Sequence, residues 1–277
     1  MSPLLTAGVQ VRLRIAAAEG ASTCNVTLDL GRSIQCVEPG SGGWRLGAAH
    51  YPWIEPCRER TVYYWDGAKF EPAARFSGAL LKLVPTEWGP PTFEIDGIKM
   101  LPSAQLSPWE DAGRKVSLVA PRGKRILDTC GGLGYFAARA LDAGAAEVCS
   151  FEKNPDVLWL RRHNPWSPRG DEPRYRMECA DVLAHIGSIT TASYDAVLHD
   201  PPRFRLAGEL YSQGFYDELA RVLVPRGRLF HYTGTPNQVS RGRDLPREVA
   251  ARLERAGFAT RLEGDGVVGE KRTNRAR

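Results

Sequence analysis

An acid followed by two prolines is the first candidate for chemistry in this chain. It ends a mostly apolar run, from Tyr194 to Leu198, in the stretch His199-Asp200-Pro201-Pro202-Arg203-Phe204. Neither proline can donate a hydrogen bond to a sheet ladder, so a buried strand must stop here. The stretch is therefore either a stiff strand-ending turn or a rigid mount that holds Asp200 for chemistry.

A glycine-rich loop follows an earlier apolar run and is the second candidate. It runs from Asp128 through Thr129 and Cys130 to Gly134, and a helical pattern begins directly after it. Glycines let the backbone turn tightly and approach a ligand, while the first turn of the helix offers free N–H groups. The spacing excludes a phosphate-cradling P-loop and departs from the dinucleotide-binding pattern, which argues against NAD.

Two further acids end apolar runs between these motifs. Glu152 lies 24 residues after Asp128, where a carboxylate can accept hydrogen bonds from two ribose hydroxyls. Its alternative is a surface acid ahead of a helix that opens at Asn154. Asp181 ends the next apolar run, and it either meets an adenine amino group or caps the helix that follows.

The elements that must position these residues alternate regularly. After a leading helix over 108–118, strands are predicted at 125–130, 147–153, 175–181, 194–200, 227–234, 259–264 and 266–272, with helices at 134–144, 155–164, 182–186, 209–223 and 245–258. Such alternation predicts a parallel sheet with helices on both faces. Ligands of such sheets bind beyond the C-terminal ends of the strands, which is where the four motifs fall.

The first hundred residues have another rhythm. Short apolar or alternating runs, broken by Gly and Pro, predict strands at 11–15, 26–30, 61–65 and 92–98. We therefore expect a β-rich N-terminal domain over 1–104 and an α/β domain over 105–277. Four tryptophans are expected in the core of the small domain: Trp44, Trp53, Trp65 and Trp88.

Composition narrows the class of protein and its partners. The 277 residues carry a net charge of +5, and six scattered cysteines form no C-x-x-C pair and accompany no histidine cluster. This favours reduced thiols in a cytoplasm over disulfides or a metal site. No apolar run is long enough to span a membrane, and the first residues lack the charged and apolar regions of a signal peptide, so we expect a soluble protein that is not exported. Residues 1–110 hold 10 Lys/Arg and 11 Asp/Glu, so the basic excess lies downstream, where it suits a polyanion or is merely solvated.

Four successive strand ends with this chemistry resemble the class I S-adenosylmethionine-dependent methyltransferases over roughly residues 105–265. The resemblance implies a Rossmann-like domain with a mostly parallel seven-stranded sheet. Cys130 replaces the first glycine of the usual loop, which is similar to methyltransferases acting on exocyclic amino groups of bases. Those enzymes carry Asp/Asn-Pro-Pro before an aromatic residue; here Arg203 takes that place and Phe204 follows. The implied catalytic residues are Asp200, Pro201 and Pro202.

A closer resemblance covers most of the chain. The segments GIKM, LDTCGGLGY, FEKNP, NPWS, HDPPRF, AGELYSQGFYDEL, RLFHYTGTP and RGRD are similar to a group of predicted methyltransferases best represented in archaea. One branch of that group is linked to N4-methylation of cytidine in small-subunit ribosomal RNA, and the group usually has Thr or Met where Gly131 stands. The resemblance implies S-adenosylmethionine as cofactor and RNA, ribosomal RNA above all, as partner.

Site residues follow from the motifs and the resemblance together. Residues expected to hold the cofactor are Asp128, Thr129, Gly132, Gly134, Tyr135, Glu152, Lys153, Asp181 and Val182. Residues expected near the substrate are His199, Arg203, Phe204, His231, Tyr232, Arg241 and Arg243, with burial of the histidines against backbone as the alternative. Other functions stay open: methyl or aminopropyl transfer to a small amine or protein nitrogen, or RNA binding without catalysis.

Overall fold

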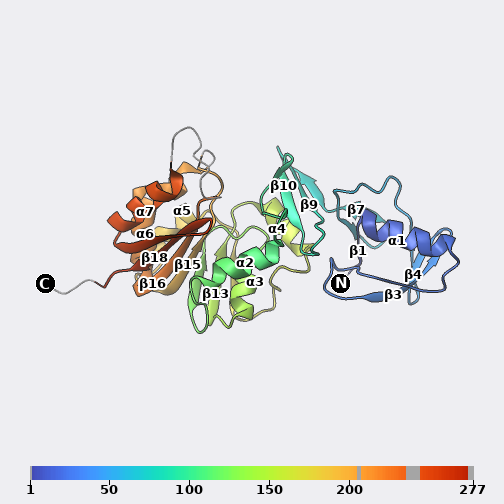
Figure 1. Ribbon diagram of the computed structural model, residues 1–277, viewed down its shortest axis with the longest axis horizontal. Helices are drawn as coiled ribbons and strands as arrows, with labels where there is room; N and C mark the ends of the chain where they lie inside the picture. Colours follow the sequence, from blue (N-terminus) through green and yellow to red (C-terminus); the bar gives the residue numbers. More distant parts are fainter. Residues whose placement is uncertain (1, 205–206, 235–243, 274–277) are drawn as a thin grey trace. The chain divides into compact units, whose positions relative to one another are not determined.

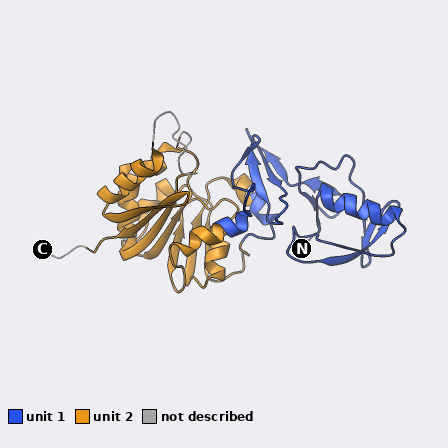
Figure 2. Ribbon diagram, viewed as in Figure 1, with its two compact units in different colours: residues 1–111, 159–167 blue, residues 112–158, 168–277 orange. Residues whose placement is uncertain are grey.

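The structure is a computed structural model that describes residues 2–204, 207–234 and 244–273. The chain forms two compact units, which Figure 2 distinguishes by colour. Unit 1 contains residues 1–111 and 159–167, and unit 2 contains residues 112–158 and 168–277. A single cut in the sequence cannot describe this division, because the segment 159–167 returns to unit 1. Each unit is described by itself.

Unit 2 is built on one seven-stranded sheet. Its strands are β12 (Arg125–Asp128), β13 (Glu147–Phe151), β14 (Tyr175–Glu178), β15 (Tyr194–His199), β16 (Leu223–Tyr232), β17 (Phe258–Glu263) and β18 (Gly266–Lys271). The order across the sheet is β14-β13-β12-β15-β16-β18-β17. All neighbouring pairs from β14 to β16 are parallel, and β18 is antiparallel to both β16 and β17. The mostly parallel seven-stranded sheet that the alternating pattern predicts is thus confirmed.

Helices cover both faces of this sheet (Figure 1). They are α2 (Pro108–Ser117), α3 (Tyr135–Asp142), α4 (Pro155–Arg162), α5 (Val182–His185), α6 (Gln213–Val222) and α7 (Leu245–Arg255), with 3-10 turns η1 (Ile186–Ser188) and η2 (Gly208–Tyr211). One buried cluster joins α5, α6 and α7 to alternate residues of the strands, among them Leu127, Val197 and Leu229. The residues between them, such as Phe230, point to the other face, where Phe136 of α3 meets it edge-on.

Local signals in the sequence explain where these helices begin. The Asp181 carboxylate accepts the Leu183 amide at the start of α5, and the Ser212 hydroxyl accepts the Phe215 amide at the start of α6. Helices α3, α6 and α7 each have a strongly apolar face, and their N-cap residues are Gly134, Ser212 and Asp244. Helix α2 matches the leading helix expected over 108–118.

Unit 1 holds three small antiparallel sheets. Their strands are β1 (Leu4–Leu5), β2 (Cys24–Val26), β3 (Gln35–Gly40), β4 (Gly43–Leu46), β5 (Ala49–Pro52), β6 (Tyr63–Trp65), β7 (Phe70–Pro72), β8 (Ala74–Phe76), β9 (Leu80–Val84), β10 (Thr92–Ile95) and β11 (Ile98–Lys99). The sheets run β1-β6-β7, β2-β3-β4-β5 and β11-β10-β9-β8. The β-rich character expected of the N-terminal part is therefore present.

The strand predicted at 11–15 is wrong, because that segment lies in helix α1 (Ala7–Ala18). The helix buries Ala7, Gln10 and Leu13, a spacing of three, and leaves Val11 and Ile15 exposed. Both polar ends of the Gln10 side chain bond to the backbone of Ile54 at 2.9 and 2.8 Å. Because Gln10 is held by these two bonds and Thr6 caps the first turn, the segment forms a helix despite its alternating apolar residues.

The core of unit 1 is partly the expected one. Trp44 is buried against Tyr51, with ring centroids 4.4 Å apart, and Trp53 and Trp65 pack against the same cluster. Trp88 departs from the prediction, since 41% of its surface is exposed. All six cysteines are free. In the described part of the chain no helix is long and apolar enough to cross a membrane, and no group of acids, histidines and cysteines is arranged to hold a metal.

Candidate active site

The glycine loop lies between the ends of β12 and β13 and is fixed by backbone bonds. Gly131 donates its amide to the Phe151 carbonyl at 2.7 Å, and Gly132 and Gly134 have φ of 48° and 84°. Those positive values are strained for residues with a Cβ, which explains the glycines. Asp128 is fully buried and accepts the Ser150 hydroxyl at 2.7 Å, so its carboxylate ties the two strands together beneath the loop.

Glu152 links the loop to the end of β13. One carboxylate oxygen accepts the Gly132 amide at 3.0 Å and the other accepts the Asn154 amide at 2.8 Å. The side chain is partly exposed. A carboxylate has about four acceptor sites, so it can accept several hydrogen bonds at once. Asn154, not Glu152, caps α4, since its own side chain accepts the Asp156 amide.

The end of β14 carries Asp181 in a capping position. One of its oxygens accepts the Leu183 amide at 3.0 Å, and the other lies 3.4 Å from the Lys153 ammonium. The capping role that the sequence left open is therefore present, and Lys153 reaches this acid from an exposed position. Tyr135 and Val182, also expected at the cofactor, begin helices α3 and α5 and are almost fully buried.

Asp200 stands partly exposed at the end of β15, and the two prolines after it are held from one side. The Tyr211 hydroxyl donates to the Pro202 carbonyl at 3.1 Å, and the Tyr211 ring meets Phe204 edge-on with centroids 5.3 Å apart. Among the described residues the Pro201 carbonyl carries no hydrogen bond. The stretch thus presents an acid and a neighbouring carbonyl on a braced backbone.

Cys130 connects the electrostatics of these strand ends. Burial raises the pKa of its thiol well above the ordinary value, and the negative charges of Glu152, Asp128 and Asp200 raise it further. The thiol of Cys130, a partly buried residue, therefore stays neutral. Because β12 pairs in parallel with both β13 and β15, the glycine loop, Glu152 and Asp200 follow neighbouring strands at one edge of the sheet.

His199 lies under Asp200, and its tautomer follows from its partners. Its Nε2 lies 3.1 Å from the Leu210 carbonyl, which can only accept, so Nε2 carries the proton. Burial, with the nearby His231 second, holds the pKa of His199 well below its usual range, so the ring is neutral. Its Nδ1 then accepts the Thr129 hydroxyl at 2.6 Å. Three segments meet on one imidazole: the glycine loop, β15 and η2.

His231 is arranged in the same way beneath the end of β16. Its Nδ1 lies 2.8 Å from the Tyr232 carbonyl and so donates, which leaves Nε2 to accept the Tyr216 hydroxyl at 3.0 Å. Burial lowers the pKa of His231 to about 4. Both histidines are fully buried, with ring centroids 4.4 Å apart. These bonds engage both histidines with the fold, as the alternative in the sequence analysis expects, and their contact with substrate stays a prediction.

Tyr232 rests on a buried cation that the sequence did not reveal. The Lys115 ammonium lies 4.1 Å from the centre of the Tyr232 ring and 3.3 Å from Asp265, and Lys115 is 1% exposed. The roles of Tyr211 and Ser150 were also missed, because no sequence pattern connects Tyr211 to the Pro202 carbonyl or Ser150 to the Asp128 carboxylate. Arg203 is exposed, and its side chain has no hydrogen bond or ion pair among the described residues.

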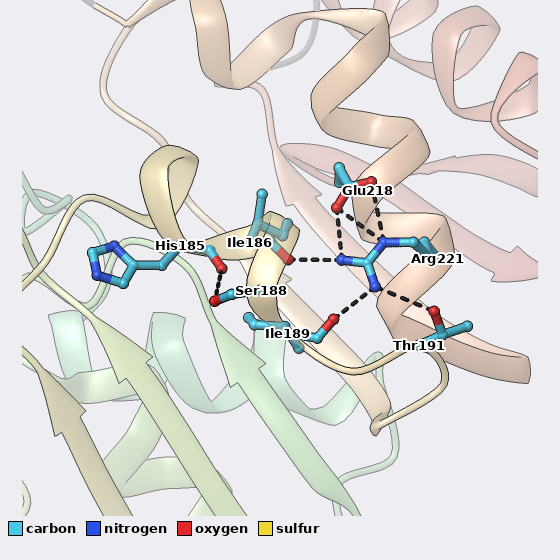
Figure 3. Close-up of polar contacts among 7 residues, drawn as sticks. All are labelled: His185, Ile186, Ser188, Ile189, Thr191, Glu218 and Arg221. Atoms are coloured by element: carbon cyan, nitrogen blue, oxygen red, sulfur yellow. Dashed lines mark hydrogen bonds and ion pairs between the residues drawn. The ribbon is translucent and has the colours of Figure 1, made fainter.

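Part of the basic excess is a cluster of three arginines, Arg221, Arg226 and Arg228, which form hydrogen bonds or ion pairs within unit 2. Figure 3 shows Arg221 donating to the carbonyls of Ile186 and Ile189, at 2.7 and 2.6 Å, and pairing with Glu218. Arg226 and Arg228 both lie within 4 Å of Glu270, at 3.9 and 3.7 Å. This part of the basic excess serves the fold. Arg241 and Arg243 lie outside the described residues.

The sheet order and the chemistry of the strand ends define the class: the chain has the class I S-adenosylmethionine-dependent methyltransferase fold. Solved structures with this fold include a spermidine synthase in complex with the transition state analogue AdoDATO, at 16% identity and a TM-score of 0.56, with 72% of each chain covered. Spermidine synthase from Thermotoga maritima matches at 16% identity and a TM-score of 0.53, over 72% of this chain and 71% of that one.

No model of a known protein family matches the chain. It belongs, however, to the family of the uncharacterized protein MJ1233 of Methanocaldococcus jannaschii, with 45% identity over 201 residues, 72% of this chain and 69% of that protein. It is 34% identical to polyamine aminopropyltransferase 2 of Streptomyces coelicolor over 40% of this chain and 21% of that protein. It is 33% identical to a tRNA U34 carboxymethyltransferase of Pseudomonas fluorescens, over 52% and 43%.

Proposed function

We propose that this S-adenosylmethionine-dependent methyltransferase transfers the methyl group to an exocyclic amino nitrogen of an RNA base, with cytidine N4 of ribosomal RNA favoured. The observation that carries the proposal is the braced Asp200-Pro201 pair. Its carboxylate, and a carbonyl that carries no hydrogen bond from the described residues, follow β15, the parallel neighbour of the strand that leads into the glycine loop. An exocyclic amine has two N–H groups to donate, which matches two rigid acceptors.

The chemistry follows from the weakness of the nucleophile. The lone pair of an amine on an aromatic ring is delocalised, so the nitrogen must become pyramidal before it attacks. Two acceptors that bind both N–H groups favour that shape, and a negative charge at Asp200 stabilises the positive charge that develops. Tyr211 bonds to the Pro202 carbonyl and so restrains the backbone directly after the two acceptors. Positioning and electrostatics therefore supply catalysis without a strong base.

The proposed cofactor residues fit S-adenosylmethionine, which supplies an electrophilic methyl on a sulfonium when bound. Glu152, which is partly exposed at the end of β13, would accept the ribose hydroxyls. The positive φ of Gly132 and Gly134 brings backbone without a Cβ to the loop surface. Asp181 would meet the adenine end only beside its capping role, with Lys153 next to it.

RNA as acceptor is supported from two sides. The motifs resemble a group linked to methylation of ribosomal RNA, and one curated relative is a tRNA U34 carboxymethyltransferase. Arg203 and Phe204 directly follow the acceptor pair, and both side chains can stack on a base. We assign Arg203, Phe204 and Tyr232 to the substrate side, with His199 and His231 as supports behind it.

Methyl transfer to total RNA tests the proposal. RNA from a strain lacking the gene should accept labelled methyl groups from S-adenosylmethionine in the presence of the protein, and wild-type RNA should accept few. Mass spectrometry of nucleosides from the two strains should then differ by one methylated base. Turnover without any RNA acceptor would contradict the proposal. Absence of methyl transfer to RNA from the strain lacking the gene would also contradict it and would favour an RNA-binding subunit.

Aminopropyl transfer to an amine is the second candidate, favoured by the spermidine synthase folds and by the match to a polyamine aminopropyltransferase. Its donor would be decarboxylated S-adenosylmethionine and its acceptor a polycation. The exposed Arg203 beside Asp200 disfavours a polycation. Incubation of the protein with putrescine and each donor decides: the mass added to the acceptor tells an aminopropyl group from a methyl.

A further inference from the structure

Unit 1 contains an open pocket of about 410 Å³ that the proposed methyl transfer does not use. Three segments form its walls: the end of β1 with the first turns of α1, the loop between β2 and β3, and the loop that follows β9. The residues that matter below are Gly8, Arg12, Leu30, Trp88 and Gly89. All of them lie within unit 1.

Two of the walls are held together by close backbone contact. Gly89 has a φ of 96°, and a Cβ at this position would lie 2.7 Å from the Leu30 carbonyl. The same carbonyl accepts the Trp166 indole N–H at 2.9 Å. The Thr86 hydroxyl donates to the Pro90 carbonyl at 2.8 Å and accepts the Trp88 amide at 3.2 Å. The loop that carries Trp88 is thus ordered before any ligand binds.

Trp88 is an exposed aromatic side chain with a fixed edge. Its indole N–H donates to the Ser103 carbonyl at 3.2 Å, while 41% of the residue remains exposed at the pocket wall. Exposure of a large aromatic surface costs free energy in water, and here the indole N–H is already satisfied. What the ring still offers is an aromatic face, which is a platform for another planar ring.

Helix α1 contributes a cation, Arg12, to the wall of the pocket. Arg12 is exposed, and among the described residues its guanidinium makes no hydrogen bond or ion pair. Its neighbour on the helix, Arg14, is by contrast paired with Glu55 at 2.5 Å and lies over Trp53. Gly8, one turn before Arg12, has open space where a Cβ would stand. The wall of α1 therefore leaves room and a charge for an anionic ligand.

We propose that this pocket binds one nucleotide of a single-stranded RNA, with the base stacked on Trp88 and the phosphate at Arg12. An aromatic side chain and a guanidinium without a partner among the described residues line the same open pocket, and they match the two recognition elements of single-stranded RNA, stacking and phosphate contact. Glu87, also in the wall, is an acceptor for base amino or ribose hydroxyl groups. The proposal rests on the proposed RNA substrate and gives unit 1 the task of holding it.

Binding of a fluorescein-labelled single-stranded RNA oligonucleotide of mixed sequence, followed by anisotropy, tests the stacking. Trp88→Ala should weaken binding about tenfold, because stacking of one base on an aromatic ring is lost, and Trp88→Phe should restore most of it. Phe76→Ala, which removes an exposed aromatic of unit 1 outside the pocket, is the control and should bind like the wild type. Equal affinities for Trp88→Ala and the wild type overturn the proposal.

Filling the pocket tests its location without removing any contact. Gly8→Glu places an acid where nothing lies within 4 Å, and it suits the first turn of a helix, so the fold should keep its thermal stability. RNA affinity should nevertheless fall at least tenfold. Gly42→Glu, in an equally open turn between β3 and β4, adds the same charge outside the pocket and should have a smaller effect. Equal losses in both variants would mean general charge repulsion and overturn the pocket.

The failures of the two proposals are distinguishable. If Trp88→Ala binds RNA normally while the wild type methylates RNA, the pocket assignment fails and the function stands. If RNA binding depends on Trp88 and Gly8 but no RNA is methylated, the pocket stands and the function fails. If Gly8→Glu no longer binds an apolar dye that the wild type binds, while its RNA affinity is unchanged, the pocket belongs to an apolar ligand and the proposal is wrong.

Discussion

The candidate active site in unit 2 has two halves, the ends of β13 and β14 and the ends of β15 and β16, and they are stabilised in different ways. At the ends of β13 and β14, Glu152 and Asp181 bind backbone amides a few residues further along the chain or in the adjoining loop, and both are partly exposed. At the ends of β15 and β16, the chain stands on His199 and His231, which are fully buried and bond to residues from distant segments. The first half is held by partly exposed carboxylates and the second by fully buried imidazoles.

Because of this difference, substitutions in the two halves should affect different properties of the protein. A partly exposed carboxylate can be replaced at the cost of its own bonds, so substitutions there should change ligand affinity or a helix cap and little else. A strand end that rests on buried polar groups transmits changes into stability, because each removed partner leaves another buried polar atom without a bond. The expected effects below run from the largest to the smallest.

Asp200→Ala should lower the rate of methyl transfer to RNA by about a hundred- to thousand-fold, or about 3–4 kcal/mol, because a charge that stabilises the transition state is lost. Affinity for S-adenosylmethionine, measured by calorimetry, should change little. Asp200→Asn keeps one acceptor oxygen and should retain some activity. A wild-type rate in Asp200→Ala would reduce the Asp-Pro-Pro stretch to a stiff turn.

Acidification should destabilise the fold through the buried histidines. Their folded-state pKa values lie below the unfolded value, well below for His199 and at about 4 for His231. Their contribution is therefore complete above about pH 6.5 and is lost as the pH falls toward 4, so the free energy of unfolding should be clearly lower at pH 5 than at pH 7. Denaturant unfolding at these pH values measures it, and His50→Gln, at an exposed position, should leave the slope unchanged. Equal stability at pH 7 and 5 would contradict the buried neutral rings.

Thr129→Val should lower the free energy of unfolding by about 2 kcal/mol, since it keeps the shape but leaves Nδ1 of His199 without its donor. Thr23→Val, at an exposed position, is the matched control. Chemical denaturation compares the two. If both variants are equally stable, the imidazole does not depend on the glycine loop, and the contrast between the two halves is lost.

Glu152→Ala should weaken binding of S-adenosylmethionine about tenfold, or about 1.4 kcal/mol, because a charged acceptor of the ribose hydroxyls disappears. The effect on stability should stay smaller, as the carboxylate binds two partly solvated amides. Calorimetry gives the affinity and thermal unfolding gives the stability. Unchanged affinity would remove Glu152 from the cofactor site.

Asp181→Ala should cost about 1 kcal/mol of stability, as loss of an N-cap does, with a smaller change in cofactor affinity. Asp181→Asn, which can still cap α5, should recover the stability. Thermal unfolding of the pair separates the roles. A tenfold loss of affinity in Asp181→Asn with normal stability would instead make the charge a cofactor contact.

The same contrast explains what the sequence could and could not predict. The strand ends and their acids follow from alternation of strands and helices, because each motif sits directly after its own apolar run. The support of His199 depends on Leu210 and Thr129, which no spacing rule connects to it. Helix α1 was hidden because Val11, Leu13 and Ile15 alternate like a strand, although only Leu13 is buried.

The segment 159–167 sets an order of events during synthesis of the chain. Unit 1 includes these residues, with the Trp166 indole bonded to the Leu30 carbonyl and Arg32 bonded to the Pro165 carbonyl at 2.5 Å. Domains usually fold from the N-terminus as the ribosome releases them. Here the first unit cannot complete its contacts until residue 167 has emerged, when β12, α3 and β13 are already outside. A nascent chain stopped before residue 159 should therefore hold an N-terminal unit that proteases still cut.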